Sequence, residues 1–187
     1  MTHGAVTHAA ARPRLDVVLR HPAEADHARL VSVIDEWWGG RRMRARLPRL
    51  WLRHFATTSW IAEVTGGADV GRLAGFLVGF VGPDDRGVAS IHLLAVDPNL
   101  RRRAVGRTLV ERFCSEVRAH GARRVESLVR PDERPAVEFA RAVGFEPVLR
   151  DPSSWIAARP IYGVPAFEDW DGPGEDRALL VRKLGAL

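Results

Sequence analysis

The stretch IHLLAVDPNLRRRAVGR, residues 91 to 107, predicts an apolar strand, then an arginine-rich loop, then the start of a helix. The strand ends at Asp97-Pro98. Small residues at Ala104 and Gly106 let an anion approach the backbone closely. The first amides of a helix lack internal partners and carry the positive end of its dipole, so such a junction binds phosphate. The stretch therefore predicts a diphosphate site at the carboxyl end of a strand.

The spacing within this loop excludes two other kinds of phosphate loop. A Walker loop needs Gly-Lys-Ser/Thr, and Lys183 is the only lysine in the chain. A dinucleotide fingerprint needs G-x-G-x-x-G, which residues 101–107 do not contain. The loop has the pattern R-x-x-A-x-G, beginning at Arg101. Taken alone, this pattern fits a phosphate site and a solvated loop of a basic protein equally well.

The strand and loop together resemble the acyl-CoA signature of the GNAT N-acetyltransferase superfamily, Q/R-x-x-G-x-G/A after a V-x-P strand end. Ala104 stands where the first glycine is usual. A second superfamily pattern, N-x-x-A-x-x-L/F-Y-x-x-x-G-F, is matched by Ala136, Phe139, Gly144 and Phe145. Two motifs at the correct mutual spacing are a specific signal. The resemblance covers roughly residues 59–148.

Two residues depart from the superfamily's second pattern. Glu133 stands where an asparagine often contacts the pantetheine region, and Ala140 stands where a tyrosine often protonates the departing thiolate. The resemblance therefore implies an enzyme whose usual acid is absent from its usual place. The same departures leave open an alternative, a non-catalytic acyl-CoA-binding module of the same fold.

The resemblance implies an α/β fold with a mixed, mostly antiparallel central sheet, a splayed parallel strand pair and flanking helices. The residue patterns agree, because turn-rich segments that suit hairpins separate apolar runs at 59–64, 71–81 and 88–96. A helix at 105–120 and a short connection should place strand 124–129 parallel to the third of these runs. We also expect a strand at 16–19, a helix that starts at 21–24 and stops at 39–40, helices at 47–55 and 131–143, and a last strand at 177–184. Residues 1–14 are predicted to be a disordered tail and 15–187 a single acetyltransferase domain.

The activity that the resemblance implies is direct transfer of an acetyl group from acetyl-CoA to a primary amine of a small molecule or peptide. In the superfamily, free amides near the end of the splayed strand bind pantetheine and polarise the thioester carbonyl. The predicted coenzyme-binding residues are Leu94, Ala95, Val96, Arg101, Arg102, Arg103, Ala104, Val105, Gly106, Arg107, Glu133 and Phe139.

The candidate general base is His92. Many members of the superfamily carry a glutamate at the position that falls on Ser90. Period-two alternation predicts that side chains 90, 92, 94 and 96 share one face, so His92 should point where that glutamate would. Imidazole titrates near neutrality and accepts a proton from an ammonium group. The alternative is a hydrogen-bonded core histidine, and Glu63 and Glu133 are weaker candidates for the base.

The acceptor side is predicted from the least patterned segments. The superfamily forms part of the acceptor wall from its first two helices, so Trp37, Trp38 and residues 41–46 are candidates. Residues 151–176 form an irregular, aromatic-containing insertion, which is usually functional in a compact domain. It contains Tyr162, the only tyrosine and the candidate acid for the leaving sulfur. Its candidate cation-recognising carboxylates are Asp169, Asp171, Glu175 and Asp176. The alternatives are a cap on the core or a homodimer surface.

Composition narrows the class of protein further. The chain of 187 residues carries a formal charge of +5, almost wholly from arginine, which favours anionic ligands. The arginines are scattered without interleaved aromatics, which argues against a nucleic-acid partner. A single cysteine fits a reducing, cytoplasmic location, and no apolar run is long enough to predict a membrane span. No histidine or cysteine spacing predicts a metal site, and no G-x-S-x-G elbow predicts a serine hydrolase.

Overall fold

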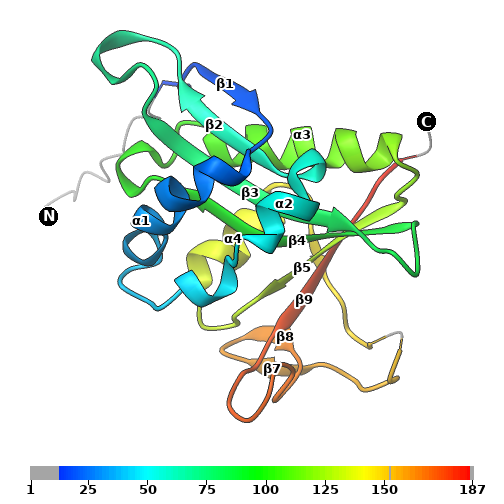
Figure 1. Ribbon diagram of the computed structural model, residues 1–187. Coiled ribbons are helices and arrows are strands. Elements are labelled where there is room, and N and C mark those ends of the chain that lie inside the picture. Colours follow the sequence, from blue (N-terminus) through cyan, green and yellow to red (C-terminus); the bar gives the residue numbers. More distant parts are fainter. Residues whose placement is uncertain (1–12, 152, 186–187) are drawn as a thin grey trace, which may run out of the picture.

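The computed structural model describes residues 13–151 and 153–185, so most of the predicted tail at 1–14 lies outside the described residues. Its centre is a seven-stranded sheet in the order β1-β2-β3-β4-β5-β9-β6 (Figure 1). The strands are β1 (Val17–Arg20), β2 (Trp60–Val64), β3 (Leu73–Val81), β4 (Val88–Val96), β5 (Arg124–Val129), β6 (Glu146–Pro147) and β9 (Ala178–Lys183). All neighbouring strands run antiparallel except β4 and β5, which run parallel. The mixed sheet with one parallel pair confirms the predicted fold class.

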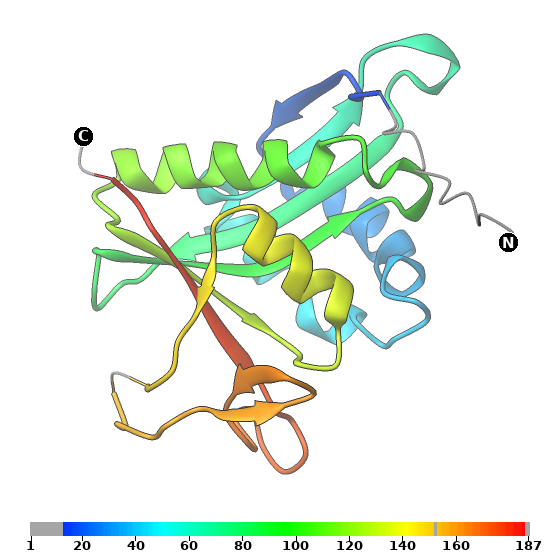
Figure 2. The same cartoon turned by 180° about the vertical axis from the view of Figure 1, so that it is seen from behind.

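Helices cover both faces of the sheet. Helices α1 (His27–Trp37) and α2 (Leu50–His54) lie on the near face in Figure 1. Helices α3 (Val105–Ala119) and α4 (Arg134–Ala142) lie on the opposite face, which Figure 2 turns toward the viewer. Within the described residues, no helix is both long and apolar enough to cross a membrane.

Each face of the sheet has its own apolar core. On the face of α1 and α2, fully buried Ile34 and Leu52 pack with Phe76 of β3. On the face of α3, Leu109 and Phe113 pack against the sheet without exposed surface. Burial on both faces explains the nearly continuous apolar sequence of β3, where alternation would be expected in a half-exposed strand.

Strands β4 and β5 separate from each other part way along their length. They pair from Val88 opposite Arg124 to Ile91 opposite Ser127, and their pairing ends there. Strand β4 nevertheless continues to Val96 along β3 on its other side. The second half of β4 therefore does not pair with β5, as expected for a splayed parallel pair.

A β-bulge at His92 corrects the predicted alternation of β4. Val78 of β3 pairs with Leu93, while the next residue, Gly79, pairs with Ile91, so His92 is the extra residue. A bulge of this kind exchanges the faces on which the following side chains lie. Leu93 accordingly joins the core beneath α1 and α2, whereas Leu94 packs toward α3. The prediction that side chains 90, 92, 94 and 96 share one face is wrong.

The insertion between β6 and β9 is folded. It contains the hairpin of β7 (Arg159–Ile161) and β8 (Val164–Ala166), which lies beside the start of β9 in Figures 1 and 2. A second hairpin, joined by the bridge of Phe167 with Arg177, carries the segment that we name the 168–176 loop. Phe167 and Ala166 are buried, so one use of the insertion is to close the core, as the alternative interpretation held.

Candidate active site

The end of strand β4 is held by Asp97. Its buried carboxylate accepts hydrogen bonds from the backbone amide of Asn99 at 2.9 Å and from the guanidinium of Arg72 at 2.7 Å. The carboxylate thus starts the short turn η5 (Pro98–Leu100) that follows the strand. This turn directs the chain across the end of the sheet toward the start of α3.

The loop that follows presents free backbone amides. Ala104 adopts the left-handed conformation with φ 67° and immediately precedes α3. In the part of the chain that the structure describes, the amides of Ala104, Val105, Gly106 and Arg107 have no hydrogen-bond acceptor. These donors and the helix dipole produce a local positive potential that suits a phosphate group.

The arginines of this loop mostly hold the protein together. Arg101 donates to the carbonyl oxygen of Trp37 at 2.7 Å, Arg103 to that of Pro13 at 3.1 Å, and Arg107 to that of Ala142 at 2.8 Å. Each guanidinium has five donors, so these contacts leave others available. The guanidinium of Arg102 has no partner among the described residues and is exposed.

Close packing joins the loop to α4. A Cβ atom on Gly106 would lie 3.0 Å from Cζ of Phe139 and 3.4 Å from Cγ2 of Val96. Glycine at 106 therefore allows α3 to approach both Phe139 and the end of β4. Ala140, on the next position of α4, is buried in the core and offers no polar group.

The backbone of the separated half of β4 also offers donors. The amide of Asp97 bonds to the carbonyl oxygen of Ala74 in β3 at 3.0 Å. Because successive amides of a strand point to opposite edges, those of Ala95 and Asp97 face β3, and those of Leu94 and Val96 face β5. Since the pairing with β5 ends at Ile91, the Leu94 and Val96 amides face the gap between the strands.

His92 lies where the two strands begin to separate. Its ring stacks on Trp51 of α2, with centroids 4.0 Å apart, and its Nε2 lies 2.7 Å from the carbonyl oxygen of Arg46. Burial lowers the pKa of His92, although the hydrogen bond to the Arg46 carbonyl opposes that effect. The side chain is therefore neutral at physiological pH, the state in which imidazole accepts a proton.

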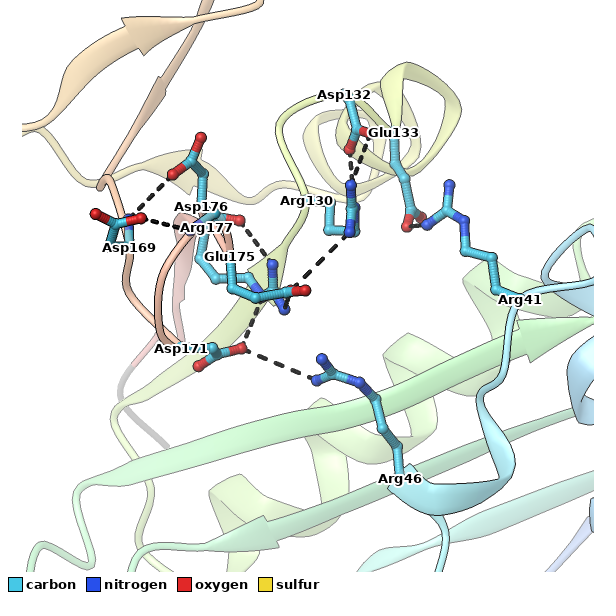
Figure 3. A network of polar contacts seen from close by, with 11 residues as sticks. Arg41, Arg46, Arg130, Asp132, Glu133, Asp169, Asp171, Glu175, Asp176 and Arg177 are labelled. Atoms are coloured by element: carbon cyan, nitrogen blue, oxygen red, sulfur yellow. Dashed lines mark hydrogen bonds and ion pairs between the residues drawn. The ribbon is translucent and has the colours of Figure 1, made fainter.

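Charged side chains from three segments form a network beside this gap (Figure 3). Glu133, before α4, pairs with Arg41 from the connection between α1 and α2. Arg130, at the end of β5, pairs with Asp132 through two hydrogen bonds of 3.0 Å, and the Asp132 contact raises the pKa of Arg130. The Glu133 carboxylate is thus already occupied by a guanidinium.

Arg177 anchors the 168–176 loop. Its side chain is 5% exposed and pairs with Asp171 at 2.8 Å and Glu175 at 2.6 Å. Asp169 and Asp176 instead accept hydrogen bonds from backbone amides of the loop itself. The four predicted cation-recognising carboxylates therefore divide into two that shape the loop and two that pair with the same buried arginine.

Tyr162 occupies the turn of the β7–β8 hairpin. Both Tyr162 and Gly163 have positive φ, 50° and 77°, as a two-residue hairpin turn requires. Tyr162 is 70% exposed, and it is the smallest of the influences, after Asp132 and Glu175, that raise the pKa of Arg130. Tyr162 and Arg130 are therefore near enough to interact electrostatically.

Glu63 lies apart from these groups. Its carboxylate bonds to Arg20 of β1 at 3.1 Å and to Arg29 of α1 at 2.5 Å. The Arg20 hydrogen bond is the main cause that lowers the pKa of Glu63. This residue joins β1, β2 and α1, and its contacts are those of a structural ion pair.

The sequence patterns did not single out Trp51, Arg130 and Arg177 as site residues. Trp51 belongs to an apolar pattern with helical spacing, which indicated a core position. Such a pattern does not reveal that the ring stacks on a histidine. Arg130 and Arg177 stand at strand ends, where only the tertiary structure brings them to the same network. The only signal in the sequence that could have indicated such site residues was a charged residue beside an apolar strand and next to an insertion.

Solved structures of acetyltransferases resemble the whole described fold. Diaminobutyrate acetyltransferase from Paenibacillus lautus, solved with L-2,4-diaminobutyric acid and coenzyme A, is 18% identical with a TM-score of 0.60 and covers 92% of this chain and 99% of its own. A structure from Salmonella typhimurium with acetyl-CoA is 14% identical with a TM-score of 0.62 and covers 92% and 96%. At such identities the likeness concerns the fold.

Sequence comparison gives the family. L-2,4-diaminobutyric acid acetyltransferase from Nocardia farcinica is 27% identical over 66% of this chain and 59% of its own length. The chain spans between 50% and 59% of the length of the curated relatives it matches. The model of the acetyltransferase (GNAT) family matches residues 25–145, which include β4, the amide-presenting loop and α4. The chain belongs to the GNAT family of acetyltransferases.

Proposed function

We propose that this protein is an acetyl-CoA-dependent N-acetyltransferase that transfers an acetyl group directly to a primary amine of a small molecule or peptide. The observation that carries the proposal is the course of β4. The strand separates from β5 at His92 and then leads into the loop with free amides at 104–107. The unpaired amides of Leu94 and Val96 and those of residues 104–107 thus belong to one continuous segment. The same segment carries the neutral imidazole of His92.

The residues present fit an acyl-CoA. The amides of 104–107 and the exposed guanidinium of Arg102 offer donors for a diphosphate. The amides of Leu94 and Val96 offer donors to a thioester carbonyl, and one such donor is worth about 10² in rate. The structures of similar fold solved with acetyl-CoA or coenzyme A support this choice of co-substrate.

Two side chains would move protons in this reaction. Because Nε2 of His92 donates to the Arg46 carbonyl, Nδ1 is the nitrogen that accepts the proton of the attacking amine. Tyr162 would return a proton to the leaving sulfur, in place of the hydroxyl group that Ala140 lacks. Release of the thiolate to water is the alternative, since a thiol with a pKa of about 8.5 leaves readily.

Ala140 favours a second candidate function, a non-catalytic acyl-CoA-binding module. Calorimetry with coenzyme A and a free-thiol release assay with acetyl-CoA and a panel of amines distinguish the two. The panel includes 2,4-diaminobutyrate, because a relative is named for that acceptor. Binding with turnover supports the enzyme, whereas binding without turnover on any amine supports the module. Absence of any heat with coenzyme A contradicts both.

A further inference from the structure

The guanidinium of Arg46 is poorly satisfied by the protein around it. Arg46 ends the short turn η2 (Arg44–Arg46) between α1 and α2. Among residues 13–151 and 153–185, its guanidinium has one charged partner, Asp171, at 3.9 Å. That separation is too long for a hydrogen bond. By contrast, Arg44 of the same turn lies 2.8 Å from Asp35.

Asp171 does not depend on Arg46. The carboxylate of Asp171 lies 2.8 Å from Nε of the buried Arg177, which holds it within the 168–176 loop. A ligand that bound to Arg46 would therefore leave the ion pair of Asp171 and Arg177 intact. Arg46 is thus a cation with free donors, next to a carboxylate that already has a hydrogen-bonded partner in Arg177.

The position of Arg46 ties it to the candidate base. Its carbonyl oxygen accepts the hydrogen bond from Nε2 of His92, at 2.7 Å, while its side chain extends toward the 168–176 loop (Figure 3). Because the imidazole contacts the backbone of Arg46, a group bound to the guanidinium would be separated from the imidazole by about the length of the Arg46 side chain. Arg130 turns a guanidinium nitrogen toward the same loop, 3.9 Å from Glu175.

We propose that Arg46 binds a carboxylate of the acceptor, so that the substrates of this enzyme are amines that also carry an acid group, as amino acids do. This inference rests on the proposed N-acetyltransferase function. Guanidinium and carboxylate groups match in a planar pair of hydrogen bonds, and a partly exposed arginine forms such a pair with little loss of solvation. The side chain of Arg46 is 45% exposed, which meets that condition.

The test compares each amino acid with the amine left by its decarboxylation. Suitable pairs are ornithine with putrescine, lysine with cadaverine, and 2,4-diaminobutyrate with its own diamine. We expect the wild-type enzyme to prefer the acid in at least one pair, and Arg46→Gln to lower kcat/KM for that acid by about 10- to 100-fold. Turnover of the decarboxylated amine should remain within about twofold, because it has no carboxylate to lose.

Two further variants separate carboxylate binding from a change in the fold. Arg46→Lys keeps the charge without the planar fork, so it should retain part of the preference. Arg53→Gln removes an exposed guanidinium of the neighbouring helix α2, where it pairs with Glu24, and should leave the preference unchanged. Thermal melting checks that each variant is folded.

The outcomes distinguish this inference from the function on which it rests. Equal kcat/KM for acids and decarboxylated amines in the wild type overturns the inference and leaves the N-acetyltransferase function standing. A preference for acids that survives in Arg46→Gln also overturns it. Coenzyme A binding without turnover on any member of the panel overturns the proposed function together with the inference.

Discussion

The Nε2 atom of His92 lies 2.7 Å from the carbonyl oxygen of Arg46. A carbonyl oxygen only accepts hydrogen bonds, so Nε2 carries the proton and Nδ1 is the basic nitrogen. The contact fixes the tautomer of the candidate base, and the stacked Trp51 fixes the plane of its ring. His92 can therefore be both a hydrogen-bonded histidine and a base, because Nε2 serves the first role and Nδ1 the second.

Replacing His92 tests the role of Nδ1. We expect His92→Ala and His92→Gln to lower kcat by about 10²- to 10⁴-fold, the usual contribution of a general base. Glutamine keeps a donor for the Arg46 carbonyl but has no basic nitrogen, so it is the control for lost structure. Coenzyme A affinity, measured by calorimetry, should be unchanged in both. Normal turnover by His92→Gln would show that the ring only positions its neighbours.

The pH dependence of kcat gives a second readout of the same residue. Burial lowers the pKa of His92 below its ordinary value of 6.5, and only the neutral ring accepts a proton. The kcat of the wild type should therefore be level near neutral pH and fall only at pH values below 6.5. His92→Gln should lose that inflection, and an inflection that persists would belong to another group.

Tyr162→Phe tests the candidate acid for the leaving sulfur. The substitution keeps the ring and the hairpin turn, in which residue 162 has φ 50°, and removes only the hydroxyl group. We expect kcat to fall by about 10-fold or more, less than for the base, because a thiolate is a competent leaving group. KM for acetyl-CoA should change little. Unaltered kcat would mean that the sulfur leaves without this proton.

Arg102→Gln tests the charge beside the free amides. Arg102 is exposed and has no protein partner within the described residues, so its loss should not destabilise the fold. Coenzyme A affinity should fall by about fivefold at low salt, as for one exposed charge contact, and by less at high salt. Arg86→Gln, in the exposed connection of β3 and β4, is the matched control and should leave affinity unchanged. Equal affinities of the Arg102 variant and the wild type at low salt would exclude a phosphate contact.

Ala104→Gly restores the glycine that the superfamily pattern carries. Ala104 has φ 67°, a conformation that costs a residue with a Cβ atom about 1 to 2 kcal/mol. Glycine removes that cost but makes the unfolded chain more flexible, so a net stabilisation of up to about 1 kcal/mol is expected. Ala136→Gly, within helix α4, should instead destabilise by about 1 kcal/mol. Urea unfolding of both variants measures the change in the free energy of unfolding, which should have opposite signs. A loss of stability in Ala104→Gly would show that the backbone of Ala104 is not strained.

Local sequence signals predicted the elements, and long-range contacts decided the details of the site. Strands β4 and β5 have the bounds that alternation and turn residues indicated. The bulge at His92 depends on the register of β3 against β4, which no local pattern records, so the predicted face of Leu94 was wrong. Ala104 and Gly106 were recognisable because backbone conformation and close packing restrict the residue type at a helix start.

Ionic partners were the least predictable part of the site. The three successive arginines of the loop suggested charge for a ligand, yet Arg101 and Arg103 bond to carbonyl oxygens of Trp37 and Pro13. An arginine can reach many groups on the surface, so its partner depends on which segments the fold brings together. For the same reason Asp171 was predicted as a carboxylate of the acceptor pocket that recognises a cation, whereas in the structure it pairs with the buried Arg177 of the chain itself.

Glu63→Gln separates a structural carboxylate from a catalytic one. Glu63 was a weaker candidate for the base, but its side chain, 17% exposed, is held by Arg20 and Arg29. We expect full acetyltransfer activity in the variant and a loss of about 1 to 3 kcal/mol in the free energy of unfolding at neutral pH. Glu138→Gln, on the exposed side of α4, is the control and should change neither quantity.

The acid dependence of this loss has a defined sign. The pKa of folded Glu63 is lowered from 4.5 by the Arg20 hydrogen bond, so the folded state binds the proton less readily than the unfolded state. The stabilisation is therefore complete above pH 4.5 and is lost as the pH falls through the lower folded value. Urea unfolding at several pH values should show the wild type and Glu63→Gln converging in strongly acidic solution. A difference that stays constant with pH would mean that Glu63 contributes through packing, and a loss of activity would return it to the candidates for the base.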